Sequence, residues 1–195
     1  QFTQQITVNS GGIYEVTLTN ALNCSKTKTF TIEASGIATI EDIIINDFQD
    51  NNTATIEISA SSLGDYEFSL DGVNYQDSNI FSNLNAGEYT VYVQDKKGCG
   101  IVFETFYILD YPKYFTPNGD GYNDTWNIKN LDKRNLENSI ITIFDRYGKL
   151  IKQVSGANEG WNGTFNGEIL PSTDYWFTIE LTNGKTIKGH FALKR

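Results

Sequence analysis

The stretch YFTPNGDGYNDTW, residues 114–126, gathers oxygen-bearing side chains around two glycines. Asparagine and aspartate at alternate positions that close on glycine are typical ligands of a hard cation such as Ca²⁺. Asn118, Asp120 and Asp124 are therefore candidate calcium ligands. The spacing does not complete an EF-hand, because Asn127 stands where that loop needs a bidentate glutamate.

The same residue types also fit a tight double turn. Pro117 fixes φ, and Gly119 and Gly121 supply positive φ. The Asn and Asp side chains can then accept hydrogen bonds from nearby backbone N–H groups. We favour the turn, keep calcium as an alternative, and find no sign of another cofactor.

Catalytic arrangements are poorly represented in this sequence. His190 is the only histidine, and strand alternation places it on an outward face beside Lys188 and Lys194. No serine or cysteine has an evident base beside it, as a nucleophilic triad needs. No carboxylate lies in an obviously apolar setting that would raise its pKa for glycosidic chemistry. We therefore predict that the protein is not an enzyme.

The three tryptophans, Trp126, Trp161 and Trp176, leave two hypotheses open. They could form a platform on which sugar rings stack, which would make this a carbohydrate-binding module. Burial in the core of a β-sandwich is the hypothesis we favour, since aromatic side chains dominate such cores.

The elements that must position these residues are predicted to be strands. Aromatics form 13% of the chain, and apolar and polar residues alternate with period two in its last third. Tyr175, Phe177, Ile179 and Leu181 share one face, and Ile187, Phe191 and Leu193 share the inner face of the last strand. Turns are expected at Tyr147–Gly148, Asn166–Gly167 and Asn183–Gly184. The expected fold is all-β, with tandem immunoglobulin-like antiparallel β-sandwich domains.

An internal repeat organises the front half of the chain. Segment 12–24, GIYEVTLTNALNC, matches segment 87–99, GEYTVYVQDKKGC, at an offset of 75 residues. Each copy carries one cysteine at the same place, Cys24 and Cys99. We favour two unpaired thiols over a disulfide, which needs Cα atoms within about 7 Å. Asp71 and Gly72 predict a two-residue hairpin turn within the second copy.

These patterns predict three domains. Residues 1–34 are the end of a truncated repeat with an exposed sheet edge, 35–110 form a complete repeat, and 111–195 form a different sandwich. We expect the chain to be a fragment whose first repeat was cut artificially or by proteolysis. The net charge is −9: residues 1–110 carry 4 Lys/Arg and 15 Asp/Glu (−11), and residues 111–195 carry 11 and 9 (+2). The acidic front half argues against nucleic-acid binding.

Two families are identified by resemblance. Residues 66–99 resemble the tandem repeat of SprB, a gliding adhesin of Bacteroidetes, through the SLDG hairpin, a G-x-Y-x-V-x-V-x-D core and a trailing GC. The last 85 residues resemble the type B, or gliding-motility-associated, C-terminal sorting domain of the type IX secretion system. The motifs that carry this second resemblance, in order, are FTPNGDGYND, ITIFDRYGKLI, WNGTFNGEILPSTDYWFTIEL and TIKGHFALKR. Asn162, Thr173, Asp174 and Ile187 depart from the usual family pattern.

The second resemblance implies a folded export signal. Family members cross the outer membrane through the type IX translocon and depend on a PorP/SprF-like outer-membrane partner, which implies an extracellular, cell-surface location. The implied sorting and partner-binding residues are Phe115, Thr116, Pro117, Asn118, Gly119, Asp120, Gly121, Asn123, Asp124, Arg146, Gly148, Trp161, Lys188, Gly189, Phe191, Lys194 and Arg195. The basic last strand could bind a partner by strand addition, or its lysines could merely protect an edge from aggregation.

The function expected from the sequence is therefore sorting, with the upstream repeats as a structural or adhesive stalk. A surface glycan is the candidate ligand of those repeats. The alternative from another class is a calcium- or carbohydrate-binding surface module.

Overall fold

The computed structural model describes residues 6–156, 160–182 and 184–195 of the 195-residue chain. The fold is all-β, as expected, with a short 3-10 helix, η1 (Asp132–Arg134). Two compact units can be distinguished. The first holds the described residues up to Asp42 with Ile56–Asn79 and Val91–Glu104, and the second holds Ile43–Thr55, Ile80–Thr90 and Thr105–Arg195.

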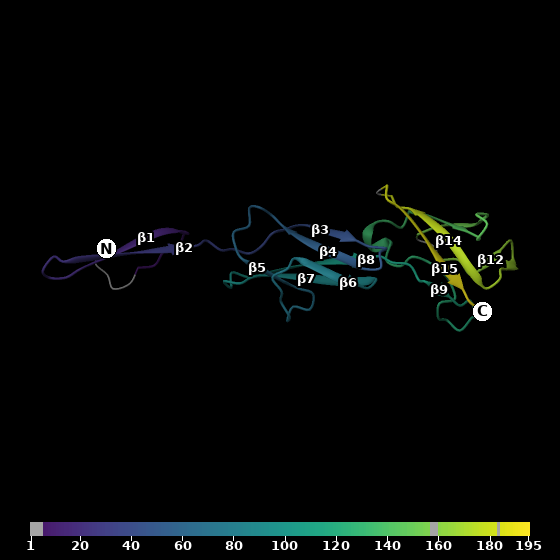
Figure 1. Ribbon diagram of the computed structural model, residues 1–195, viewed down its shortest axis with the longest axis horizontal. Helices are drawn as coiled ribbons and strands as arrows, with labels where there is room; N and C mark the ends of the chain where they lie inside the picture. Colours follow the sequence, from purple (N-terminus) through teal and green to yellow (C-terminus); the bar gives the residue numbers. More distant parts are fainter. Residues whose placement is uncertain (1–5, 157–159, 183) are drawn as a thin grey trace. The chain divides into compact units, whose positions relative to one another are not determined.

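The chain begins with a hairpin of two antiparallel strands, β1 (Gly12–Thr19) and β2 (Ser25–Ile32), drawn in purple in Figure 1. Asn20 closes the turn, because its side-chain Oδ1 accepts the backbone N–H groups of Leu22 and Cys24 at 2.9 and 3.0 Å. Among the described residues no third strand pairs with this hairpin, so both of its edges are open. Cys24 and Cys99 are free, exposed thiols.

The next strands form two three-stranded sheets, in which β4 and β6 pair antiparallel, as do β5 and β7. Burial alternates along the strands: Val91, Val93 and Asp95 are buried on β7, and Ala54 and Ile56 on β4. This period of two is what a half-buried strand requires. One sheet has the order β3 (Ile40–Asn46), β4 (Asn52–Ile58), β6 (Ile80–Leu84), and the other β5 (Tyr66–Ser69), β7 (Gly87–Asp95), β8 (Ile101–Ile108).

The prediction of a two-residue hairpin turn at Asp71 and Gly72 was wrong. β5 pairs with β7, and Phe68 forms an isolated bridge with Gln76, so a longer loop lies between them. The Asp71 carboxylate accepts the backbone N–H groups of Asn74 and Val73, and these hydrogen bonds, those of Asn74 first, hold the pKa of Asp71 far below its usual range. The aspartate thus builds an open loop through its side chain, and a tight turn is not needed.

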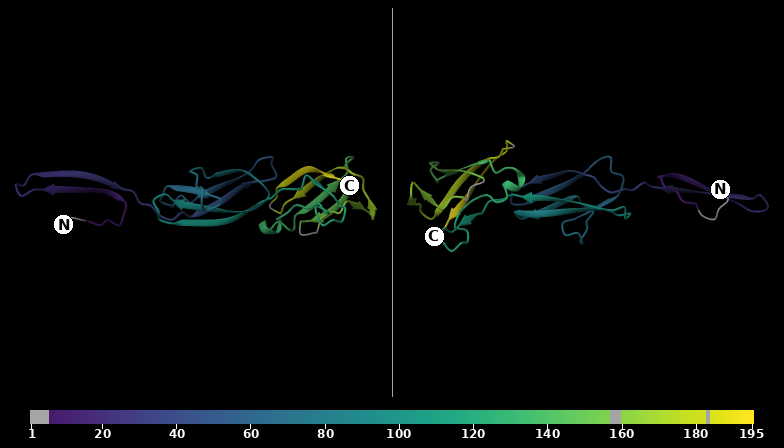
Figure 2. Two further views of the ribbon diagram at one scale, coloured as in Figure 1. Left: turned by 90° about the horizontal axis from the view of Figure 1, so that it is seen from below. Right: turned by 180° about the vertical axis from the view of Figure 1, so that it is seen from behind.

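The last part of the chain forms a five-stranded sheet, whose strands β14 and β15 lie side by side in Figures 1 and 2. Its pairs are antiparallel except the last, β15 with β9, which is parallel. The order is β11 (Leu150–Ser155), β10 (Ile140–Phe144), β14 (Thr173–Glu180), β15 (Thr186–Leu193), β9 (Tyr114–Phe115). A small hairpin, β12 (Thr164–Phe165) and β13 (Glu168–Ile169), lies apart from this ladder.

An aromatic core fills one face of this sheet. Trp126 stacks on Phe191 with ring centroids 3.8 Å apart, and Trp126 and Trp161 exchange two backbone hydrogen bonds of 2.9 Å. Both tryptophans are buried, as expected, but Trp176 is 41% exposed. The expectation of burial was wrong for Trp176, because it alternates with Tyr175 and Phe177 and so faces outward.

The turn glycines mostly follow the sequence. Asn166 and Gly167 both have positive φ, 51° and 86°, as a two-residue turn between β12 and β13 requires. Gly148 has φ 79° between β10 and β11. Of the third expected turn, Gly184 has φ 87°, whereas Asn183 lies outside the described residues.

Candidate functional site

The loop after β9 is organised by one carboxylate. Asp124 accepts the backbone N–H groups of Asn118, Gly119 and Gly121 at 3.0, 2.6 and 2.8 Å. These hydrogen bonds, that of Gly119 first, lower the pKa of Asp124 from its ordinary value of 3.8. Hydrogen bonds of this kind stabilise the charged form of the carboxylate. The carboxylate in turn takes the place of water as the hydrogen-bond acceptor for these backbone N–H groups.

The remaining polar groups of the loop also satisfy one another. Asn118 Oδ1 accepts the N–H of Asp120 at 3.1 Å, and Asp120 Oδ1 accepts the N–H of Tyr122 at 2.8 Å. The N–H of Thr116 donates to the carbonyl of Asn123 at 2.7 Å and closes the loop. The geometry is that of the double turn that we favoured.

This loop does not fit a calcium ion as it stands. N–H groups point at both carboxylate oxygens of Asp124, which is the position that a cation would have to take. In addition, the side chain of Asn118 donates from Nδ2 to Asp120 Oδ2 at 2.8 Å. Within the ranges that the structure describes, no three or more His, Cys, Asp or Glu side chains are grouped as a metal site.

Phe115 anchors the loop to the core. Its side chain is fully buried, and its ring lies 5.4 Å from that of Trp161 and 5.9 Å from that of Phe191. The expected sorting residues Phe115, Trp161 and Phe191 therefore meet in one aromatic cluster. Pro117 is half-buried beside them in sequence, whereas residues 118–123 are exposed.

The carboxyl terminus is tied to the turn that follows Trp161. The Arg195 guanidinium donates to the carbonyls of Leu170 and Gly163 at 2.6 and 3.2 Å. Gly163 has φ 80°, and a Cβ there would lie 2.7 Å from Leu193 Cδ1. Arg195, expected as a partner contact, thus also has a structural task inside the domain.

The β10–β11 turn carries Arg146 and Gly148. Asp145 Oδ1 accepts the N–H groups of Tyr147 and Lys149 at 2.8 and 2.9 Å, and the guanidinium of Arg146 lies 5.0 Å from the Tyr147 ring centre. The turn borders a surface cavity of about 320 Å³. Its lining also includes residues that we did not expect at a site, namely Ile151, Phe165, Leu170, Pro171, Ser172, Thr173 and Tyr175.

The outer edge of β15 is open along residues 186–190. Ala192 and Lys194 donate their N–H groups to the carbonyls of Lys113 and Phe115 at 2.9 and 3.0 Å, which pairs the end of β15 with β9. Main-chain N–H and C=O groups alternate in direction along a strand. Those of Lys188 therefore point to the same edge of β15 as those of Ala192 and Lys194. In the described part of the chain no strand pairs with β15 there.

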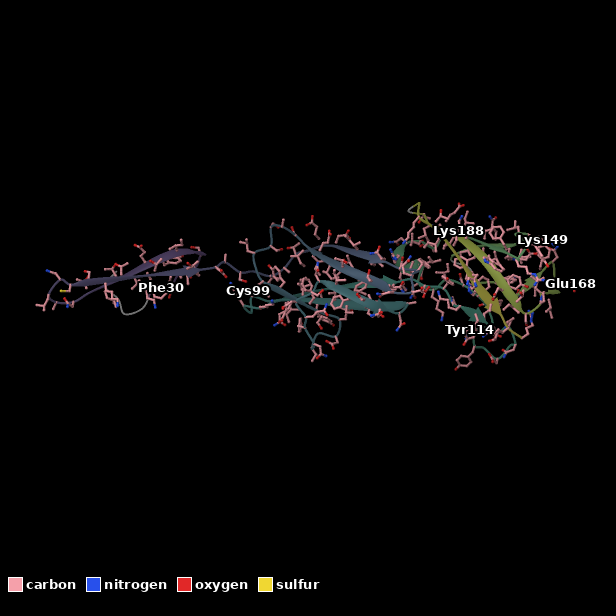
Figure 3. All side chains as sticks on the ribbon, in the orientation of Figure 1. Phe30, Cys99, Tyr114, Lys149, Glu168 and Lys188 are labelled. Carbon is pink, nitrogen blue, oxygen red and sulfur yellow. The ribbon has the colours of Figure 1, made fainter. Side chains whose placement is uncertain are left out.

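Figure 3 labels Lys188 on β15 and Tyr114 on the neighbouring β9. Lys188 and Lys194 are exposed, and the Lys194 ammonium lies 4.5 Å from the centre of the Tyr114 ring. Gly189 has a packing role instead: a Cβ there would approach the rings of Phe177 and Tyr111 within 2.9 Å. Tyr111 is a contributor that the sequence patterns did not single out.

His190 is exposed on the same strand, as expected, with its ring centre 6.2 Å from that of Trp176.

Within the described residues, no helix combines the length and the apolar character needed to cross a membrane.

The segment that contains the five-stranded sheet matches a known protein family. Residues 109–193 match the CHU_C type IX secretion signal domain. This segment is a type IX secretion signal domain. The resemblance found in its motifs is thereby confirmed, and the sorting role that the family implies extends to this part of the chain. No curated protein matches the sequence.

Solved structures show weaker likenesses. PorZ, a surface component of the type IX secretion system of Porphyromonas gingivalis, is 16% identical over 86% of this chain and 26% of its own, with a TM-score of 0.35. The BSP domain of a biofilm associated protein is 14% identical over 80% and 29%, with a TM-score of 0.29. The FN1–FN3 domains of chicken CNTN1 are 13% identical over 92% and 77%, with a TM-score of 0.28. This chain spans less than a third of the length of the first two.

Proposed function

We propose that the secretion signal domain is the export and sorting signal of a gliding adhesin of Bacteroidetes. The match of residues 109–193 to its family model carries the proposal. The type IX translocon would carry the protein across the outer membrane, and a PorP/SprF-like outer-membrane protein would hold it at the cell surface. The task is recognition of a folded domain, without catalysis.

The domains before the signal would serve as a stalk. In this proposal residues 1–34 are part of one SprB-like repeat, residues 35–110 are a second, and the signal domain occupies 111–195. A surface glycan is the candidate ligand of the repeats.

Strand addition at β15 is the recognition mode that we propose. The open edge offers main-chain donors and acceptors along residues 186–190, and an incoming strand could pair with them. Lys188 and Lys194 make this edge positive, which suits a partner strand that carries Asp or Glu. The loop of residues 116–124 and the cavity beside Arg146 are further surfaces that a partner could contact.

The test is a secreted reporter fused to the complete chain in a host with a working type IX system. We expect the reporter at the cell surface, and expect Lys188→Glu to reduce its surface amount several-fold by reversing the charge of the edge. Lys152→Glu is the matched control, because Lys152 is exposed on β11 at the far side of the same sheet. Surface labelling of intact cells measures both.

Two results would count against the proposal. If the wild-type fusion stays inside the cell in a competent host, the sorting role is wrong. If the wild type is exported and Lys188→Glu behaves like Lys152→Glu, the sorting role stands but recognition does not use this edge.

A further inference from the structure

A buried carboxylate from the preceding repeat lies among cations of the signal domain. The Asp47 side chain is 3% exposed, and both of its partners belong to the same compact unit. Arg134, at the end of η1, donates from Nη1 to Asp47 Oδ2, and the Lys185 ammonium lies 3.5 Å from Oδ1. The N–H of Leu109 adds a third contact to Oδ2 at 3.4 Å. A buried carboxylate is stable in a fold when it is paired and hydrogen-bonded in this way.

The next residue makes a second and independent contact. Phe48 has φ 62°, a left-handed conformation that a residue with a bulky side chain adopts at a cost. In this conformation its side chain packs against the core cluster of the signal domain, and its N–H donates to the carbonyl of Leu109 at 3.4 Å. Strain of this kind persists where the surrounding contacts over-determine the backbone.

The turn that presents both residues is itself braced. Asn52 Oδ1 accepts the N–H of Gln49 at 2.9 Å, and Asn52 Nδ2 donates to the carbonyl of Leu84 at 3.0 Å. Asn52 is buried, so these bonds fix the turn between β3 and β4 in one shape. The repeat that contains Asp47 and Phe48 therefore fixes the backbone conformation in which these two residues contact the signal domain.

We propose that Asp47 and Phe48 complete the secretion signal domain, so that its folded unit begins at Ile43 inside the preceding repeat. The groups that receive Asp47 are the Arg134 guanidinium, the Lys185 ammonium and the N–H of Leu109, and the core cluster receives Phe48. These groups select a carboxylate with an adjoining apolar side chain. Residues 109–193 alone leave them and the adjoining part of the core without these contacts.

The tryptophans allow a selective test. The chain has three, at positions 126, 161 and 176, all of them in the signal domain. Thermal unfolding of the purified complete chain, followed by tryptophan fluorescence, therefore reports on this domain alone. Asp47→Asn is expected to lower the midpoint by at least about 5 °C, because it removes the buried anion that pairs with Arg134 and Lys185. Asp50→Asn is the matched control, since Asp50 is an exposed carboxylate in the same turn.

A double-mutant cycle separates a direct contact from a general loss of the repeat. Arg134→Gln should lower the same midpoint, and the double variant should lose less than the two single losses combined. Additive losses, or a fluorescence midpoint that Asp47→Asn leaves within about 1 °C of wild type, would overturn the proposal. Should Asp47→Asn not fold, Lys185→Gln provides a milder change, because Lys185 is 46% exposed. A midpoint unchanged by Lys185→Gln and additive with Arg134→Gln would then overturn it.

The inference rests on the proposed function only in calling the domain a signal. Fluorescence is measured on the purified chain, so a failure of export would count against the sorting role and leave the midpoint shifts standing. Normal export together with unshifted midpoints would instead remove this inference alone.

Discussion

At the scale of single residues, aspartates here work mainly as acceptors for local backbone N–H groups. Asp71, Asp124 and Asp145 each accept two or three such bonds within their own loop. An alternation of Asn, Asp and Gly therefore looks alike whether the oxygens bind a metal or the chain itself. Only the direction of the N–H groups distinguishes the two.

Asp124 should make stability depend on acid. Its folded pKa is lowered from 3.8, so its contribution to stability is fully present above 3.8 and is lost as the pH falls through the lower folded value. Asp124→Asn should reduce the free energy of unfolding at neutral pH, and the difference from wild type should shrink below the ordinary pKa. Denaturant titrations across that pH range measure it. Asp174→Asn, which removes an exposed carboxylate of β14, is the matched control for the loss of one negative charge.

Gly163 and Gly167 form a matched pair for backbone strain and packing. Both have positive φ, 80° and 86°, but only a Cβ at Gly163 would meet close neighbours, among them Arg195 Nη2 at 2.9 Å. Gly167→Ala should cost about 1 kcal/mol for the conformation, and Gly163→Ala should cost at least about 2 kcal/mol because overpacking adds to it. Chemical denaturation of both variants checks this, and equal costs would show that the neighbours of Gly163 yield freely.

At the scale of elements, strands are placed by their period and loops by their own polar groups. The aromatic face of β14 and β15 meets Phe115, Trp126 and Trp161, which come from short segments with little regular structure of their own. The loop of residues 116–124 is thus fixed at its start by Phe115 in the core and internally by Asp124. Hydrogen bonds among its own polar groups occupy the carboxylate oxygens of Asp124.

Excess calcium should therefore leave the loop unchanged. We expect the same melting temperature in calcium and in a chelator, because a ligand that binds the folded state would raise it. A clear rise in calcium that disappears in Asp120→Asn would restore the metal-loop alternative.

At the scale of the whole molecule, the parts of the chain differ in how much they bury. β1 and β2 contribute no buried residue, whereas the signal domain holds a continuous aromatic and aliphatic core. The charge differs too, because the acidic residues concentrate before residue 111. A recognition tag at one end and an acidic stalk at the other is the division of labour that we propose.

Deletion of residues 1–32 should leave the signal domain intact. This deletion keeps Glu33, which pairs with Lys97 at 2.6 Å, and removes β1 and β2, two strands that contain no buried residue. The fluorescence midpoint is expected to stay within about 1 °C of wild type, because distant sites contribute independently. A larger fall would mean that the hairpin supports the signal domain in a way that its exposure does not indicate.

Features that depend on local periodicity and turn chemistry could be predicted from the sequence. The alternation of apolar and polar residues predicted that Phe177, Phe191 and their neighbours lie on the inner face of the sheet. The Asn166–Gly167 pair predicted a turn with positive φ. The ordered motifs identified the secretion signal domain. These features are local, because a strand's two faces and a turn's φ values are decided within a few residues.

Tertiary structure alone decided which distant residues meet. Nothing near Asp47 in the sequence indicates that it lies beside Arg134 and Lys185, residues that are 87 and 138 positions further along the chain. Nor does sequence spacing indicate that Arg195 caps the turn at Gly163. Such contacts arise only when separate strands are brought to one side of a shared core, and burial then removes the water that would otherwise satisfy their charges.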